Sequence, residues 1–182
     1  MRGNVDALRD RLLRRESLPH AERAAIHGSR RDGVRESLLF HYLPPGYDPA
    51  SLETYPVIVF HDGYSWWEDG EAKNILDYLI DKKRIQPLIG VFVPPVEREE
   101  EYAFNKTNQF EDFITWELMP YIDSRFRTKT DPGERAMTGN SYGGLITTQI
   151  CYNHPEIFGL AAPFSAAYNP KNREVFNAVV NG

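Results

Sequence analysis

The sequence predicts an α/β protein in which helices cover both faces of a mostly parallel β-sheet, forming a three-layer sandwich. Short apolar segments bounded by turn residues alternate with helical segments of about 10 to 15 residues, which is typical of βαβ units. Several of the apolar segments lack polar alternation, as expected of parallel strands that are buried on both faces.

The first predicted element is an amphipathic helix over residues 4–16, because Val5, Leu8 and Leu12 recur at helical spacing. We assign residues 1–32 to an N-terminal helical extension and residues 33–182 to the α/β core. The apolar stripe of the helix fits packing against the core, and it also fits binding to a partner.

Three strands and one helix are expected next. Val34–Tyr42 has a strand-like pattern, and a loop rich in Pro and Gly follows it. Val57–Phe60 and Leu88–Val93 are short apolar runs with turn residues on both sides, which predicts buried strands. Residues 72–83 lie between these two runs and place their aliphatic residues on one helical face.

The longest predicted helix covers residues 109–126 and carries an apolar stripe. Asn108 is expected to cap it, with Glu111 completing a capping-box pair. Pro120 is expected to kink the helix, because its ring would clash with the carbonyl of Trp116.

The last predicted elements are a strand over Arg135–Thr138, a helix over residues 142–153 and a strand over Leu160–Ser165. Pro155 prevents the helix from continuing. The junction between the first strand and the helix carries the strongest chemical signal in the sequence.

That junction, Gly139–Gly143, fits the pattern G-x-S-x-G with Ser141 at its centre. In a strand–turn–helix of this kind the serine hydroxyl stands clear of the backbone, and the glycines let strand and helix approach closely. The helix N-terminus directs amide N–H groups at a developing negative oxygen. The motif predicts Ser141 as a nucleophile; the alternative is a glycine-rich turn that serves packing alone.

A second motif, His61–Trp67, directly follows the predicted strand Val57–Phe60. Gly63 would let the chain turn so that the backbone N–H of Tyr64 faces the serine, with the N–H of Tyr142 as the partner donor of an oxyanion hole. His61 is either a general base or, as we favour, a hydrogen-bonded structural residue. Asp62 is either a catalytic acid or, as we favour, a side chain that fixes the loop. The remaining pair, Trp66 and Trp67, would line a substrate pocket or pack the loop.

Residues 97–101 form a charged run, Glu-Arg-Glu-Glu-Glu. Such runs are usually solvated. The alternative is an ion pair between Arg98 and Glu101 that holds the loop above the site, with Asn105 orienting it. Arg98 and Asn105 are therefore candidate substrate-binding residues, together with Gly63, Trp66 and Trp67.

The order of these motifs resembles the putative esterase family of the α/β-hydrolase fold, which contains enterochelin esterases, S-formylglutathione hydrolases, feruloyl esterases and mycolyltransferases. The matching segments, within about residues 34–168, are Pro44–Asp48, Tyr55–Gly63, Arg98-x-x-Glu101-Tyr102, Glu117–Asp123 and Gly139–Gly144. The resemblance implies an α/β-hydrolase fold and hydrolysis of a carboxylic ester through an acyl-enzyme on Ser141, of the enterochelin-esterase kind. It implies no metal or organic cofactor.

The sequence departs from that pattern after Ser141. In α/β-hydrolases the acid and then the histidine follow the nucleophile along the chain. Here 41 residues follow Ser141, and their one histidine, His154, lies at the far end of the predicted helix. Glu156 and Glu174 are expected to be surface carboxylates. We therefore expect the catalytic acid, the histidine and the C-terminal βα units to be missing, through truncation or because another chain supplies them.

Composition narrows the function further. The net charge of −5 argues against a nucleic-acid-binding protein, and no apolar run is long enough to span a membrane. The lone cysteine, Cys151, excludes an internal disulfide, and no two histidines have ligand spacing for a metallohydrolase. We expect a cytoplasmic protein that acts on a small-molecule ester, of undetermined oligomeric state. The alternative is a binding or scaffold protein that keeps the hydrolase sheet without catalysis.

Overall fold

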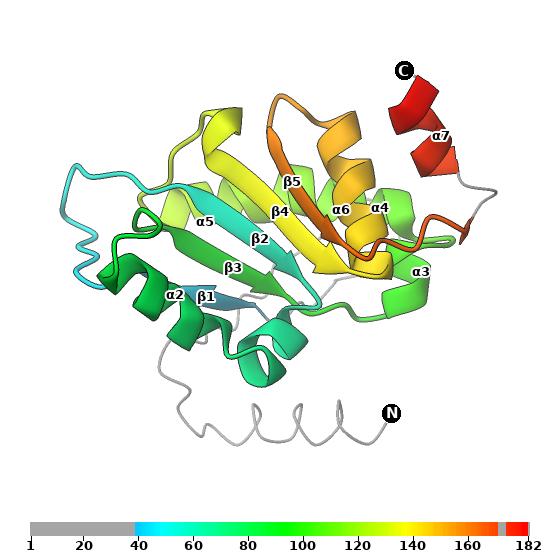
Figure 1. Ribbon diagram of the computed structural model, residues 1–182. Helices are drawn as coiled ribbons and strands as arrows, with labels where there is room; N and C mark the ends of the chain where they lie inside the picture. Colours follow the sequence, from blue (N-terminus) through cyan, green and yellow to red (C-terminus); the bar gives the residue numbers. More distant parts are fainter. Residues whose placement is uncertain (1–38, 171–173, 182) are drawn as a thin grey trace.

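The computed structural model describes residues 39–170 and 174–181. Its centre is a five-stranded sheet with the order β1-β3-β2-β4-β5 (Figure 1). The predicted helix over residues 4–16, and with it the N-terminal extension over residues 1–32, lies outside the described residues.

The sheet is mostly parallel, as the alternation of strands and helices predicts. The strands β2 (Val57–His61), β3 (Ile89–Val93), β4 (Arg135–Asn140) and β5 (Leu160–Phe164) run parallel to their neighbours. The short strand β1 (Phe40–Tyr42) pairs antiparallel with β3 at one edge. Because β2 and β4 are parallel neighbours in register, the loops that follow them leave the same edge of the sheet.

Helices cover both faces of the sheet, which confirms the three-layer prediction. Helix α2 (Ala72–Asp81) packs on one face, and α4 (Thr107–Asp112), α5 (Met119–Arg125) and α6 (Tyr142–Asn153) pack on the other (Figure 1). The central strands are apolar because each face meets a helix layer: Phe60 and Phe92 point toward α2, and Val59 and Val91 toward α6 and its neighbours.

The predicted helix over residues 109–126 differs from expectation in three ways. It begins at Thr107, so Asn108 lies inside the helix, and the residue at the cap position, Lys106, makes no side-chain cap bond. Glu111 forms no capping box and instead turns toward α6. Before Pro120 the helix widens into the π-helix η2 (Phe113–Leu118), which replaces the α-helical bonding pattern at the place where the proline ring would clash.

Strand β5 is exposed along its whole length, so the expectation that the strands are buried on both faces is wrong for it. It lies at an edge of the sheet, and no strand among the described residues pairs with its outer side. Pro163 fits such a position because an edge strand tolerates a residue without an N–H donor. The segment directly after β5 contacts α6 through the hydrogen bond between Tyr168 and Thr148, and the last described helix is α7 (Glu174–Asn181). None of the helices in the described part of the chain has the length and apolar character needed to cross a bilayer.

Candidate active site

Ser141 occupies a strained turn between β4 and α6. Its backbone has φ 58° and ψ −118°, a conformation that residues with a Cβ rarely adopt. The turn is held by a hydrogen bond from the Ser141 N–H to the Phe164 carbonyl (3.0 Å). The residue is partly exposed, and no described side chain hydrogen-bonds its hydroxyl. The backbone thus follows the strand–turn–helix path that the motif predicts. We call residues 139–143 the nucleophile turn, after the role predicted for Ser141.

The glycines of the motif are required by close backbone approach, as predicted. A Cβ on Gly139 would lie 2.5 Å from the carbonyl carbon of Gly143, across the turn. One on Gly144 would lie 3.0 Å from the Cβ of Ala166, in the segment after β5. Larger residues would therefore push the strand and the helix apart and open the turn.

Two backbone amides near the turn lie at the beginnings of helical segments. The first α-helical bond of α6 runs from the Leu145 N–H to the Ser141 carbonyl (3.1 Å), so the Tyr142 amide has no acceptor within the helix. Tyr64 likewise lies in the first turn that leads into the π-helix η1 (Ser65–Asp69), after β2. Gly63 lets this loop lie directly against strand β3, because a Cβ there would lie 2.4 Å from the backbone of Phe92 and Val93.

A bidentate ion pair joins the loop after β2 to helix α3 (Arg98–Tyr102). Arg98 donates from Nε to Asp62 Oδ1 (2.7 Å) and from Nη2 to Asp62 Oδ2 (2.8 Å). The expected pair between Arg98 and Glu101 is wrong: Glu101 is buried, and its carboxylate accepts the Val96 N–H (3.1 Å). Asp62 thus fixes the loop, the role that we favoured for it.

Arg98 also contacts the nucleophile turn. Its Nη2 donates to the carbonyl of Asn140, the residue before Ser141 (3.2 Å). The guanidinium lies over the rings of Tyr102 and Tyr142, at 5.6 and 5.9 Å from their centroids. The hydrogen bond with Asp62 raises the pKa of Arg98. The loop after β2, helix α3 and the turn at Ser141 are therefore all in contact with the Arg98 guanidinium.

The two tryptophans have different surroundings. Trp67 packs against the core, stacked on Phe40 at 5.8 Å and edge-on to Phe92 at 5.1 Å. Trp66 lies between Phe60 (5.6 Å) and Phe164 (5.9 Å), and Phe164 is 54% exposed at the end of β5. Trp66 and Phe164 together thus form an aromatic surface, and the carbonyl of Phe164 accepts the N–H of Ser141.

Asn105 lies in the loop after α3 and is exposed. Its side chain donates to Glu100 Oε2 (2.9 Å), and its backbone N–H donates to the same oxygen (3.2 Å). These two hydrogen bonds tie the loop to the helix α3 that precedes it. Asn105 makes no hydrogen bond to the loop after β2 or to the nucleophile turn.

The geometry makes His61 a buried packing residue and not a general base, and within the described residues the expectation that its ring is hydrogen-bonded is wrong. Its ring is fully buried at 5.5 Å from both Tyr102 and Phe110, and neither ring nitrogen has a hydrogen-bond partner among the described residues. Burial lowers the pKa of His61 to about 3. It makes no contact with the Ser141 hydroxyl through which a proton could pass.

His154 follows α6, whereas Ser141 precedes it, as expected. Its Nε2 lies 2.9 Å from Glu111 Oε1 and its Nδ1 lies 3.2 Å from Glu156 Oε1. Glu111 also accepts from the amides of Gln149 (2.7 Å) and Asn153 (2.9 Å). We call these four residues, Glu111, Gln149, Asn153 and His154, the α4–α6 latch. No local pattern predicts this latch, because Glu111 lies 38 to 43 positions before its three partners along the chain.

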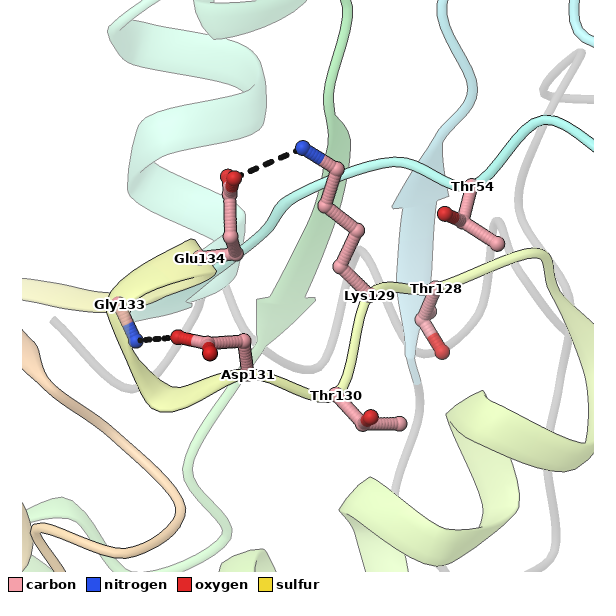
Figure 2. Close-up of a pocket in the computed structure, with 7 residues that line it drawn as sticks. All are labelled: Thr54, Thr128, Lys129, Thr130, Asp131, Gly133 and Glu134. Atoms are coloured by element: carbon pink, nitrogen blue, oxygen red, sulfur yellow. Dashed lines mark hydrogen bonds and ion pairs between the residues drawn. The ribbon is translucent and has the colours of Figure 1, made fainter.

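One hollow of the described surface, a polar depression of about 650 Å³, lies away from Ser141. Lys129 pairs with Glu134 there at 2.8 Å. Its lining residues, drawn in Figure 2, are Thr54, Thr128, Lys129, Thr130, Asp131, Gly133 and Glu134. It adjoins the start of β4, whereas Ser141 follows the end of that strand. A smaller hollow of about 290 Å³ lies in the segment after β5 and is lined by Ala166, Tyr168, Asn169 and Phe176.

The smaller hollow is connected to the nucleophile turn, because the N–H of Ala167 donates to the Ser141 carbonyl (3.1 Å). Tyr168 anchors the same segment to α6 through a 2.8 Å hydrogen bond with Thr148. In the part of the chain that the structure describes, no group of three or more His, Cys, Asp or Glu side chains could hold a metal ion.

The family model described as "Putative esterase" matches residues 35–178, which is most of the chain. The chain belongs to the putative esterase family. A sequence relative of this esterase-family chain is the endo-1,4-beta-xylanase/feruloyl esterase of Xylanibacter ruminicola, 36% identical over 129 residues. That match covers 65% of this chain and 18% of the relative. The protein YbbA of Bacillus subtilis is 28% identical over 141 residues, which cover 70% of this chain and 55% of YbbA.

Solved structures of related fold agree with the family assignment. The IroE-like serine hydrolase of Shewanella oneidensis superposes with a TM-score of 0.75 at 21% identity, over 89% of this chain and 57% of that protein. The BES protein of Bacillus cereus gives a TM-score of 0.73 at 24% identity, over 91% and 68%. These likenesses show that the fold is that of the α/β-hydrolase-like esterases. The chain spans about half, or less, of the length of the curated relatives it matches.

Proposed function

We propose that this protein is a serine hydrolase of carboxylic esters, with Ser141 as its nucleophile. The observation that carries the proposal is the strained backbone of Ser141 at the strand–helix turn, where φ is 58° and the backbone of Gly143 leaves no room for a Cβ on Gly139. Membership of an esterase family and the resemblance to a serine hydrolase fold support it. An exposed serine at a helix start serves attack on a carbonyl carbon.

The proposed reaction begins with attack by Ser141 Oγ on the ester carbonyl carbon, which forms a C–O bond and moves the carbonyl π electrons onto oxygen. The amides of Tyr64 and Tyr142 would hold that oxyanion, each contributing about 3 kcal/mol to transition-state stabilisation. Collapse of the intermediate expels the alcohol oxygen and leaves an acyl-enzyme. A base must take the Oγ proton, and later activate water.

None of the described residues is placed to act as that base. We therefore propose that this chain by itself acylates slowly, with the acid and histidine of the reaction coming from outside the described residues. A p-nitrophenyl ester is a suitable probe because its leaving group departs as the anion and needs no general acid. Added imidazole can supply the missing base.

The test is acetylation of the chain by p-nitrophenyl acetate with increasing imidazole, followed by peptide mapping. We expect one acetyl group on the peptide that contains Ser141, formed at a rate that rises with imidazole concentration. Ser141→Ala should remove that label and leave the slow labelling of surface lysines unchanged. Equal consumption of the ester by Ser141→Ala and the unaltered chain would refute the proposal.

The surroundings of Ser141 favour esters with a flat or aromatic group. Trp66 and the exposed ring of Phe164 form the aromatic surface described above. Of the candidate substrate-binding residues, Trp66 fits this role best, since Trp67 packs on Phe40 and Phe92 and Gly63 allows close backbone packing. We propose a small-molecule catecholate, feruloyl or related ester of the enterochelin-esterase kind. One sequence relative carries feruloyl esterase in its name.

The second candidate is a non-catalytic binding protein with the same sheet. The observation that favours it is the lack of any hydrogen-bond partner for the Ser141 hydroxyl among the described residues. A fluorophosphonate probe with imidazole present separates the two functions. An operative oxyanion hole makes Ser141 react faster than the serines elsewhere on the surface, whereas a binding protein shows no such preference.

A further inference from the structure

The ion pair between Asp62 and Arg98 joins the two segments from which the oxyanion donors come. Asp62 precedes Tyr64 by two residues, and Arg98 also bonds the carbonyl of Asn140, two residues before Tyr142. The backbone of Asp62 is held as well: its N–H donates to the Tyr102 hydroxyl (2.9 Å), and its carbonyl accepts from the Ser65 N–H (2.9 Å). The separation of the two amides is thus set through this pair.

Asp62 also places a negative charge where the proposed chemistry disfavours one. Its Oδ2 lies 3.0 Å from the position of a Cβ on Gly143, so the carboxylate rests against the first turn of α6. That turn supplies the Tyr142 amide. A bare carboxylate there would repel the oxyanion that develops during attack, most strongly in a site from which water is excluded.

Arg98 removes that conflict. Its guanidinium binds both oxygens of Asp62, and two of its three nitrogens are used in doing so and in bonding Asn140. A planar guanidinium fits a carboxylate in this forked manner, whereas a lysine would act as a point charge. The guanidinium of Arg98 is already bonded to Asp62 and to the carbonyl of Asn140. These bonds argue against the expected role of Arg98 in substrate binding.

We propose that Asp62 and Arg98 are positioning residues of the oxyanion hole. Asp62 fixes the loop that carries Tyr64 against the turn that carries Tyr142, and Arg98 both completes this link and neutralises Asp62. The proposal rests on the proposed function of Ser141. It has a specific consequence for the acylation rate: removing Arg98 alone should slow acylation more than removing the side chains of both Asp62 and Arg98.

The experiment compares Arg98→Gln, Asp62→Asn and the double variant in the imidazole-assisted acetylation of Ser141. Arg98→Gln should slow the maximal acylation rate by roughly tenfold or more, because an unneutralised charge and a displaced amide both raise the barrier. Adding Asp62→Asn should restore part of that loss, so that the double variant is faster than Arg98→Gln. Arg98→Lys, which keeps the charge and loses the fork, should lie between Arg98→Gln and the unaltered chain.

A matched control pair exists at the other end of β4. Arg135 Nη2 donates to both carboxylate oxygens of Asp123 at 2.8 Å, beside the start of the strand. Asp123→Asn should lower the stability to urea and leave the acylation rate of the folded protein unchanged. Each rate is corrected by the folded fraction from circular dichroism, so a loss of stability is not counted as a loss of positioning.

Several results would overturn the proposal. One is a double variant as slow as, or slower than, Arg98→Gln; another is acylation at the original rate in every Asp62 and Arg98 variant. If Arg98→Gln alters only the ester concentration needed for half-maximal rate, Arg98 binds substrate instead. If Arg98→Gln does not fold, the same ordering is tested between Arg98→Lys and its Asp62→Asn double. Labelling that persists in Ser141→Ala points to failure of the proposed function and not of the positioning pair.

Discussion

The turn at Ser141 stores backbone strain in a residue that has a Cβ, at a cost of about 1 to 3 kcal/mol. Asp62, in the neighbouring loop, has a positive φ of 56° as well. Both positions are stabilised by their surroundings: Ser141 by the Phe164 carbonyl, and Asp62 by Tyr102 and Arg98. Backbone strain in two neighbouring loops, which follow β2 and β4, is consistent with a functional site, since strained residues cluster at such sites.

His61 makes the stability of the protein depend on pH. Its pKa is lowered to about 3 by burial, whereas an unfolded histidine titrates near 6.5. Between these values the unfolded chain binds the proton and the folded chain does not, so stability is full above pH 6.5 and falls as the pH drops toward 3. The expected slope from His61 is up to about 1.4 kcal/mol per pH unit.

The check is urea unfolding between pH 7 and pH 4, followed by fluorescence. His61→Leu should flatten the acid side of the profile, because an apolar side chain in the same pocket has no proton to bind. Equal slopes for His61→Leu and the unaltered chain would show that His61 is not the group responsible.

Helices α4 and α6 are joined by more than apolar packing. The α4–α6 latch places one buried carboxylate, Glu111, among three donors at 2.7 to 2.9 Å. Hydrogen bonds to a buried charge are worth more than those between neutral groups, and the donors would be left unsatisfied without it. The latch holds the far end of the helix whose near end carries Ser141.

Glu111→Ala should therefore lower the free energy of unfolding by about 2 to 4 kcal/mol. Glu156→Ala removes the outer, mostly exposed partner of His154 and should leave the free energy of unfolding almost unchanged. Both values come from urea denaturation at pH 7. A Glu111→Ala loss no larger than that of Glu156→Ala would mean that the latch contributes little to stability.

The described residues bring the proposed nucleophile, Ser141, and two candidate oxyanion donors together without a base for them. Purified chain should therefore turn over p-nitrophenyl acetate at close to the uncatalysed rate when no imidazole is added. With imidazole, the acetyl-enzyme should accumulate, because the step that activates water lacks a base as well. Stopped assays with mass spectrometry of the intact protein measure both.

Robust turnover without imidazole would contradict this expectation and show that a base has been overlooked. His61→Leu would be the first variant to test in that case, because His61 is the histidine that adjoins the nucleophile turn. Loss of turnover in that variant would assign the base to it, against the packing described above.

Local patterns were enough to predict most of the fold and the centre of the site. Apolar runs and helical periodicity located β2, α2, β3, β4 and α6 to within a few residues, since each depends on nearby side chains. The nucleophile turn was predictable because Gly139, Ser141 and Gly143 act within one short segment. The start of α4, the π-helix before Pro120 and the exposure of β5 were not, because they depend on what packs against each element.

The partners of charged residues depended on the folded arrangement. Asp62 and Arg98 are 36 positions apart, and Glu111 and His154 are 43 apart, so no local pattern joins either pair. The charged run suggested Glu101 as the alternative partner of Arg98, whereas in the fold Arg98 pairs with Asp62. Sequence can state that a serine stands at a strand–helix turn, since chain geometry enforces it. Which charges and amides surround that serine follows from how distant segments meet, and only folding brings them within hydrogen-bond distance.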